Sequence, residues 1–312
     1  MTVATPFISP WELGASLYMP ASQRDLLAYA NGEKGPKLRS MIFCTEDAIA
    51  QADISHSIKH LGLCLQGFQQ QEHCYRFIRV RNPTVLDQLL NLPDIHLIDG
   101  FVLPKFNLHI FHAYFDQLRG TAFKIMPTLE TKDVFDHNAM QELRSALLQP
   151  GIMDNILLLR IGGNDLLSLL GMRRPKHFTL YETPIGLVIK QLVTWFKPFG
   201  FNLSAPVFDY LNDPVTLERE IALDLAHGLV GKTAIHPSQI AMIEANYPVE
   251  YEDYDMAIQI TDPKALAVFK LHNTMCEVAT HTQWALNILE RQRCYGYKCS
   301  FSANDCIQAP YS

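Results

Sequence analysis

Short apolar runs recur along this chain, and most of them stop at a charged or polar residue. Runs that are rich in Ile, Val, Leu or Phe predict strands at 14–19, 41–44, 76–80, 98–103, 123–127, 156–161, 204–208 and 232–235. Continuous apolar runs of this length are expected of strands that are covered on both faces. Helical patterns lie between them, at 22–31, 47–62, 84–91, 107–119, 132–148, 184–199 and 214–228. Eight strands alternating with helices predict an α/β fold, a (β/α)₈ barrel, and no Gly-x-Gly-x-x-Gly follows the first strand.

The pattern changes after about Tyr247. Residues 247–255 (YPVEYEDYD) are acidic and aromatic and indicate a linker, 263–291 indicates one or two helices, and the last stretch (YGYKCSFSANDCIQAPYS) indicates a loose tail. We therefore predict a catalytic barrel over 1–246 and a C-terminal helical appendage with a tail over 247–312. Apolar positions of the appendage, such as Leu271 and Trp284, would form an exposed patch unless they are buried on the chain's own barrel or on a neighbouring subunit.

Composition narrows the class of protein. The 312 residues are 48% hydrophobic and 19% charged, which is enough for a sizeable core, and the net charge of −6 with no basic run argues against nucleic-acid binding. No apolar stretch reaches membrane-spanning length. The seven cysteines are scattered and form no Cys-x-x-Cys pair, which predicts reduced thiols in a cytoplasm and no zinc site.

Two carboxylates follow neighbouring predicted strands. IMPTLET (125–131) places Glu130 after the fifth strand, and LLLRIGGND (157–165) places Asp165 after the sixth. In a parallel barrel the loops at the carboxyl ends of the strands build the site, and two carboxylates there suit Mg²⁺. Each alone could instead cap a helix, but the pair beside Gly162-Gly163, where backbone can approach a ligand closely, favours a metal site.

Other polar residues at strand ends are candidates for the same site. Arg79 and Arg81 end the third strand on one face by alternation, and they could bind an anion or pair with Glu46 or Asp47. Lys105 follows the fourth strand in the same way. Glu46-Asp47 could be metal ligands, could orient an arginine or a metal-bound water, or could mark a helix N-terminus.

His236, in AIHPSQI (234–240), could be a catalytic base. The structural alternative is favoured: Pro237 and Ser238 start a helix and hydrogen bonds hold the imidazole.

Seven segments in order resemble the citrate lyase beta-subunit-like family of the HpcH/HpaI aldolase superfamily. They are LGASLYMPA, MIFCTEDAIA, IRVRNP, DGFVLPK, IMPTLET, IGGNDLLSLLG and GKTAIHPSQI. The resemblance implies a TIM barrel, commonly trimeric, that uses Mg²⁺ (or Mn²⁺) to make or break a carbon–carbon bond. The chain departs from the family pattern at Cys44, Arg81, Asn164 and Met275-Cys276-Glu277. The sequence that follows, THTQWALNILERQRCYG, resembles a divergent subgroup of C–C bond lyases.

The resemblance also implies roles for particular residues. Glu130 and Asp165 would hold the metal, Arg79 would face the developing charge, and Glu46 and Asp47 would support the arginine and a metal-bound water. We further predict that the substrate is bound by Arg79, Lys105, Gly162, Gly163 and His236. The base would be Glu277 of a neighbouring chain or a metal-bound hydroxide.

The implied reaction is the cleavage of a β-hydroxy acid, or of its acyl thioester with coenzyme A, to a keto acid and an enolate-derived product. Its partners would be small molecules and other copies of this chain, with a homotrimer favoured. The alternative is a non-catalytic barrel that keeps the metal site and binds a metabolite or a partner.

Overall fold

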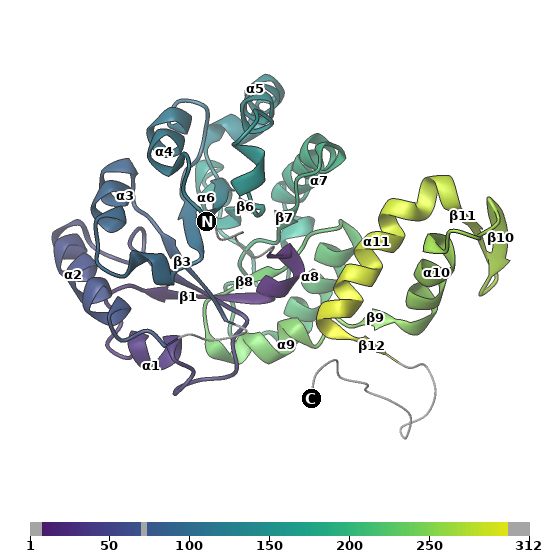
Figure 1. Cartoon of the computed structure of the whole chain (residues 1–312), viewed down its shortest axis with the longest axis horizontal. Helices are drawn as coiled ribbons and strands as arrows, with labels where there is room; N and C mark the ends of the chain where they lie inside the picture. The colour runs from purple at the N-terminus through teal and green to yellow at the C-terminus, as the bar shows by residue number, and fades with distance from the viewer. Residues whose placement is uncertain (1–7, 70–73, 299–312) are drawn as a thin grey trace, which may run out of the picture. The chain divides into compact units, whose positions relative to one another are not determined.

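The computed structural model describes residues 8–69 and 74–298. The chain divides into two compact units, Met1–Ile243 and Glu244–Ser312 (Figure 1). The tail predicted at the C-terminus lies outside the described residues from position 299 onward. Within the described part of the chain, no helix is both long enough and apolar enough to cross a membrane.

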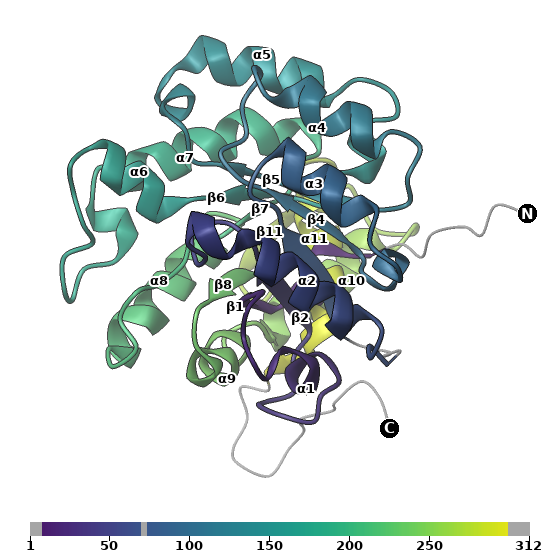
Figure 2. The same cartoon turned by 90° about the vertical axis from the view of Figure 1, so that its left-hand side faces the viewer.

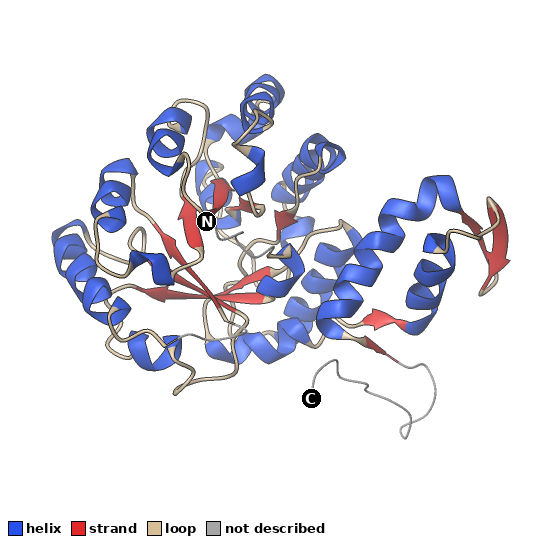
Figure 3. Ribbon diagram, viewed as in Figure 1, coloured by secondary structure: helices blue, strands red, loops and turns tan. Residues whose placement is uncertain are grey.

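The first unit is built on eight parallel strands, drawn in red at its centre in Figure 3. The strands are β1 Ala15–Pro20, β2 Ser40–Cys44, β3 Tyr75–Arg79, β4 Gly100–Leu103, β5 Lys124–Leu129, β6 Leu159–Ile161, β7 Leu203–Ser204 and β8 Lys232–Ala234. Their order is β7-β6-β5-β4-β3-β2-β1-β8. A bridge between Ala205 and Lys232 joins the two ends, and Val230 N–H donates to Leu203 O at 2.8 Å. The predicted (β/α)₈ barrel is therefore confirmed.

Helices follow the strands and surround the barrel, as Figure 2 shows. They are α1 Leu26–Ala30, α2 Ile54–Leu65, α3 Pro83–Leu90, α4 Phe111–Leu118, α5 His137–Leu147, α6 Gly163–Leu169, α7 Ile185–Phe196, α8 Pro214–Ala226 and α9 Ile240–Glu244. Two helix starts follow directly from the sequence. Asn82 and Asp213 each precede a proline, and each side chain accepts a hydrogen bond from a backbone N–H of the first turn.

Among the helix starts predicted for the barrel, that of α2 lies furthest from the observed one. The pattern at 47–62 predicted a helix from Asp47, but α2 begins at Ile54, after a short 3₁₀ turn at Gln51–Asp53. Ion pairs and carbonyl contacts of the segment after β2, described below, hold residues 46–49 in a loop. The prediction for these residues was wrong because side-chain contacts outweigh local helix propensity.

The barrel interior contains an apolar layer of side chains and a polar layer. Ile42, Phe77, Val102 and Met126 come from the four successive strands β2 to β5, and they pack in one buried cluster with Leu158, the residue before β6. Leu13 and Ile8, which precede β1, join this cluster at the amino ends of the strands. Branched and aromatic side chains fill this layer as in other parallel barrels. The layer nearer the carboxyl ends is polar, and it supports the candidate site.

The second unit combines helices with two small sheets. α10 Tyr251–Thr261 and α11 Val278–Tyr295 pack together, β9 Val249–Glu250 pairs with β12 Tyr297–Lys298, and β10 Val268–Leu271 forms an antiparallel hairpin with β11 Thr274–Glu277. The predicted linker at 247–255 was therefore wrong, and so was a helix over 263–277.

The hairpin has a local cause. His272 and Asn273 both have positive φ, 46° and 59°, as a two-residue turn between antiparallel strands requires. Burial alternates at a period of two along β10, where Phe269 and Leu271 are half-buried and the residues before each are exposed. Spacings of three and four between apolar residues had instead indicated a helix. Leu266, Val268 and Met275 remain exposed in this unit.

Candidate active site

Six candidate residues come from five successive strand ends of the barrel. Glu46 and Asp47 follow β2, Arg79 ends β3, Lys105 follows β4, Glu130 follows β5, and Asp165 lies in the first turn of α6 after β6. Because all eight strands are parallel, these positions share the end of the barrel where active sites form in this fold. Strands β5 and β6 are neighbours, as the sequence predicted.

Arg79 lies at the centre of these contacts and is buried. Its Nη2 lies 2.8 Å from Glu46 Oε2 and 3.1 Å from Glu130 Oε1, and its Nε donates to the same Glu46 oxygen at 3.1 Å. A third carboxylate, that of Asp47, approaches Nη2 at 3.4 Å. Burial alone lowers the pKa of Arg79, but the surrounding negative charge more than offsets it and raises the pKa. The guanidinium is thus a permanent cation at the mouth of the barrel.

Lys105 contributes both its side chain and its backbone. The Nζ lies 2.5 Å from Glu46 Oε1 and 3.1 Å from Asp47 Oδ1. Its backbone N–H donates to Glu130 Oε1 at 2.7 Å, and it does so from the left-handed region, with φ 48°. A non-glycine residue in this region costs free energy, and such strain often accompanies a functional site.

Glu46 and Asp47 both form ion pairs with Arg79 and Lys105. Burial raises the pKa of Glu46, and the hydrogen bond with Asp47 raises it further. The positive charges of Arg79 and Lys105 lower this pKa, but the net shift is upward. Burial also raises the pKa of Asp47, but hydrogen bonds with Glu46 and Lys105 outweigh this effect, so the pKa of Asp47 is lowered. Asp47 is therefore the more readily ionised of the two carboxyls.

Glu130 is the most deeply placed carboxylate of the site, with a residue exposure of 2%. Its Oε1 accepts from Arg79 and from the Lys105 backbone, whereas its Oε2 is buried and has no hydrogen-bond partner among the described residues. Burial raises the pKa of Glu130 to about 7, Arg79 opposes this, and the nearby charge of Asp165 adds to it. An unpartnered buried oxygen beside a second carboxylate is a place for a cation.

Gly162 is required by this arrangement. A Cβ at position 162 would lie 2.2 Å from Glu130 Oε2, so any other residue would displace the carboxylate. At Gly163 a Cβ would meet Leu180 and Pro206 within 3 Å. Both glycines therefore have packing reasons, and the ligand contacts assigned to them from the sequence stay predictions.

Neither capping alternative for the two carboxylates is observed. α6 begins at Gly163 with Gly162 as its N-cap, so Asp165 lies within the first turn and does not cap. The 3₁₀ turn after β5, Lys132–Phe135, has Thr131 as its N-cap, and Glu130 faces Arg79 instead. Asp165 is half-buried, and its carboxylate has no hydrogen bond or ion pair within residues 8–69 and 74–298.

The donor set fits a hard divalent cation. No group of three or more His, Cys, Asp or Glu side chains in the described part of the chain could hold a metal by itself. Mg²⁺ commonly takes only one or two protein carboxylates and fills its remaining positions with water and substrate oxygens. Glu130 and Asp165 meet that requirement, and the free Oε2 of Glu130 is the oxygen available for it.

Two predicted residues of the barrel lie outside this centre, and a third predicted residue belongs to the second unit. The Arg81 guanidinium donates to the carbonyls of Glu46 and Ile49, at 3.2 and 3.0 Å, and so anchors the loop that carries Glu46. His236 is exposed and caps a short turn by accepting from the Ser238 N–H. Glu277 belongs to the second unit, where it ends β11 and accepts from Thr280 Oγ1 at 3.0 Å.

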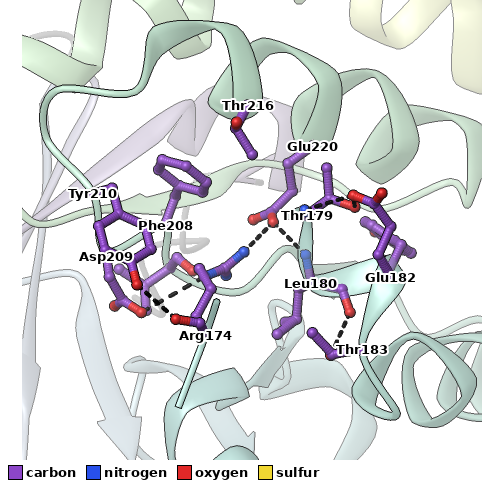
Figure 4. Close-up of polar contacts among 12 residues, drawn as sticks. Arg174, Thr179, Leu180, Glu182, Thr183, Phe208, Asp209, Tyr210, Thr216 and Glu220 are labelled. Atoms are coloured by element: carbon purple, nitrogen blue, oxygen red, sulfur yellow. Dashed lines mark hydrogen bonds and ion pairs between the residues drawn. The ribbon is translucent and has the colours of Figure 1, made fainter. Parts of the chain in front are cut away.

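A buried ionic network supports the mouth, and the sequence analysis did not single it out (Figure 4). Arg174, in the segment after α6, pairs with Glu220 of α8 and lies 3.6 Å from Asp209, and it donates to Val207 O. Asp209 in turn accepts from the amide of Asn164 at 2.8 Å, next to Asp165. On the other side, Lys232 pairs with Glu220 and with Asp224.

This network ties the start of α6 to α8 and β8. The sequence held one signal for it, because Asn164 replaces an acidic residue of the family pattern directly before Asp165. An amide there can donate to Asp209, which a carboxylate could not do.

A family model described as C-C_Bond_Lyase of the TIM-Barrel fold matches residues 7–297. The chain belongs to this family. The resemblance drawn from the seven motifs is thereby confirmed, and the protein is a member of a lyase family. No curated protein matches the chain.

Solved structures share the fold at low sequence identity. CitE from Mycobacterium tuberculosis, in complex with magnesium, acetoacetate and coenzyme A, has a TM-score of 0.65 at 20% identity, over 89% of this chain and 98% of that one. A citrate lyase from Burkholderia xenovorans LB400 has 0.68 at 16%, over 95% and 96%. Malate synthase from Haloferax volcanii has 0.63 at 15%, over 88% and 80%.

Proposed function

We propose that this lyase cleaves a β-hydroxy acid, or its acyl thioester with coenzyme A, to a keto acid and an enolate-derived product, and that it uses Mg²⁺. One observation carries the proposal. Glu130 has one oxygen held by Arg79 and the Lys105 backbone, while its other oxygen is buried without a partner near Asp165. A cation at the second oxygen would complete the site.

The ligands bound in a similar solved structure support the same chemistry. The Mycobacterium tuberculosis protein was solved with magnesium together with acetoacetate and coenzyme A, with acetate, and with pyruvate. These ligands are small acids of the size that a retro-aldol cleavage releases. We propose Mg²⁺ as the metal, and Mn²⁺ as the metal that could replace it, because both take oxygen ligands.

The residues of the site have separable roles in this reaction. When bound, the metal would supply a Lewis acid for the hydroxyl and carboxylate oxygens of the substrate. Arg79 is buried and fixed by Glu46, so it presents a preorganised positive charge where the enolate oxygen develops. Lys105 is half-exposed at the mouth and would attract the anionic substrate. The Glu46–Asp47 pair orients both cations.

A substrate panel tests the proposal. Purified protein is incubated with hydroxy acids and with their coenzyme A thioesters, with Mg²⁺ or with a chelator, and keto-acid release is measured with a carbonyl reagent. We expect Mg²⁺-dependent release from at least one member, and none from the Glu130→Gln variant. Glu142→Gln, at an exposed position of the outer helix α5, is the matched control and should behave as the wild type. Tight, metal-dependent binding without release from any member would favour the non-catalytic barrel instead.

A further inference from the structure

Arg160 is a buried arginine of β6 whose charge the described protein does not neutralise. Its exposure is 3%. It makes two hydrogen bonds, both to uncharged atoms: Nη1 donates to Met126 Sδ at 3.7 Å, and Nη2 donates to Thr233 Oγ1 at 2.5 Å. The guanidinium also lies 5.5 Å from the centroid of the Tyr18 ring. Within residues 8–69 and 74–298 no carboxylate pairs with Arg160, unlike the buried Arg79 and Arg174.

The two neighbours of Arg160 in the barrel are also unsatisfied. Thr128 on β5 and Ser204 on β7 are its partners in register, so their side chains lie on the same face as the guanidinium. Each is 2% exposed, and neither hydroxyl oxygen has a hydrogen-bond partner among the described residues. A buried cation without a counter-ion and two buried hydroxyl oxygens without hydrogen-bond partners are costly, and a ligand or ordered water would satisfy them.

The polar layer lies one step below the candidate metal ligands. Glu130 is two residues beyond Thr128, and Gly162 is two residues beyond Arg160, so alternation places them on the same inner face. Two residues of strand rise separate the layers by about 7 Å. Position 162 has no side chain, and the Glu130 side chain fills the space that one would take. The distance is comparable with the length of a short dicarboxylic acid.

We propose that Arg160, with Thr128 and Ser204, forms a carboxylate subsite in the barrel, and that the substrate or product is a short dicarboxylic acid. One carboxylate would be held at the Glu130–Asp165 end and the other by the guanidinium, which matches a carboxylate with two parallel N–H donors. The nature of the ligand rests on the proposed function, whereas the subsite rests on the unpaired cation and hydroxyls. A monocarboxylic acid of equal length would leave the guanidinium without its counter-ion.

The test compares two four-carbon probes that differ by one carboxylate, succinate and butyrate. Binding to the full-length protein with saturating Mg²⁺ is measured by calorimetry. We expect the wild type to prefer succinate by about tenfold or more, the value of a charge-assisted hydrogen bond to a buried group. Arg160→Met should remove the preference and Arg160→Lys should reduce it. Arg144→Met, whose guanidinium lies over Phe199, should keep it.

Two further variants keep the test decisive if Arg160→Met does not fold. Thr128→Val and Ser204→Ala retain the cation and should each weaken succinate binding severalfold while leaving butyrate binding unchanged. The proposal is overturned if the wild type shows no preference for succinate, or if folded Arg160 or hydroxyl variants keep the full preference. Arg160 would then be a structural residue only.

The outcome is separable from that of the proposed function. Succinate binding that depends on Arg160, together with no keto-acid release from any substrate, would refute the lyase reaction and leave the subsite standing. Turnover of a monocarboxylic substrate that does not respond to Arg160→Met would support the lyase reaction and overturn the subsite.

Discussion

The backbone of Lys105 fixes one oxygen of Glu130. The N–H of Lys105 donates to Glu130 Oε1 at 2.7 Å from a left-handed conformation. The same residue reaches Glu46 and Asp47 with its ammonium group. Lys105 therefore positions the proposed metal ligand through its main chain, and it completes the ion pairs through its side chain.

Lys105→Gly and Lys105→Ala separate these two functions. Both remove the ammonium group, but glycine adopts φ 48° without strain, so Lys105→Gly should be more stable than Lys105→Ala by about 1 kcal/mol. Urea unfolding measures the difference. Equal stabilities would mean that the left-handed backbone stores no strain. Both variants should lose substrate affinity to a similar degree, since the charge is gone in each.

Glu130→Gln and Asp165→Asn should abolish Mg²⁺ binding and leave the fold intact. Each substitution replaces a carboxylate with a neutral amide of nearly the same shape, and the amide is a poor ligand for a hard cation. Binding is followed by the Mg²⁺-dependent shift in melting temperature, with Glu142→Gln on the outer helix α5 as control. A full shift in either site variant would remove that residue from the metal site.

The pH dependence of stability should identify Glu130 in the metal-free protein. Its pKa is raised to about 7 from an ordinary 4.5, so its favourable contribution is complete below the unfolded value and is lost as the pH rises through 7. Between pH 5 and pH 8 the wild type should therefore lose stability relative to Glu130→Gln, and Mg²⁺ should restore it at pH 8. A constant difference between the two proteins over this range would contradict the raised pKa.

Arg79→Lys should lower turnover by at least tenfold although the charge is kept. Arg79 contacts Glu46 through two nitrogens and Glu130 through one of them, and a single ammonium cannot reproduce that geometry. Arg81→Lys is the comparison, since the Arg81 guanidinium donates to the backbone carbonyls of Glu46 and Ile49. This substitution should loosen the loop more than it affects the chemistry. Full activity of Arg79→Lys would overturn the role proposed for its guanidinium.

Assembly is tested by complementation. We expect a homo-oligomer, a trimer by family resemblance, in which Glu277 of one subunit serves the barrel of another. Mixing Glu130→Gln chains with Glu277→Gln chains should then restore part of the activity, because some sites receive both wild-type residues. Sedimentation gives the oligomeric state, and subunit exchange is verified with tagged chains. A monomer, or no recovery after verified exchange, would refute the shared site.

The barrel was predictable because its strands are buried on both faces. Such strands read as short apolar runs, and the charged residues at their ends mark the mouth without any tertiary information. The pairing of Glu46 with Arg79 was offered as one alternative among several, since sequence spacing does not tell which carboxylate reaches which cation. The start of α2 was missed for the same reason: the loop at 46–49 is set by contacts with Lys105 and Arg81.

Other features depend on partners that are remote in sequence. The hairpin of β10 and β11 was interpreted as helix because its apolar residues also fit helical spacing, and only the turn at His272-Asn273 distinguishes the two. Arg160 stands in an apolar run, where it could have been noticed. Its lack of a counter-ion is visible only when the neighbouring strands are in register.

The carbonyl contacts of Arg81 have a consequence for how this site can change. Arg81 holds the loop after β2 through the main-chain oxygens of Glu46 and Ile49, and every amino acid supplies such an oxygen. The anchor is therefore indifferent to the side chains that the loop carries. Ala48 and Ala50 are exposed, so both can be varied together without removing the oxygens that Arg81 contacts.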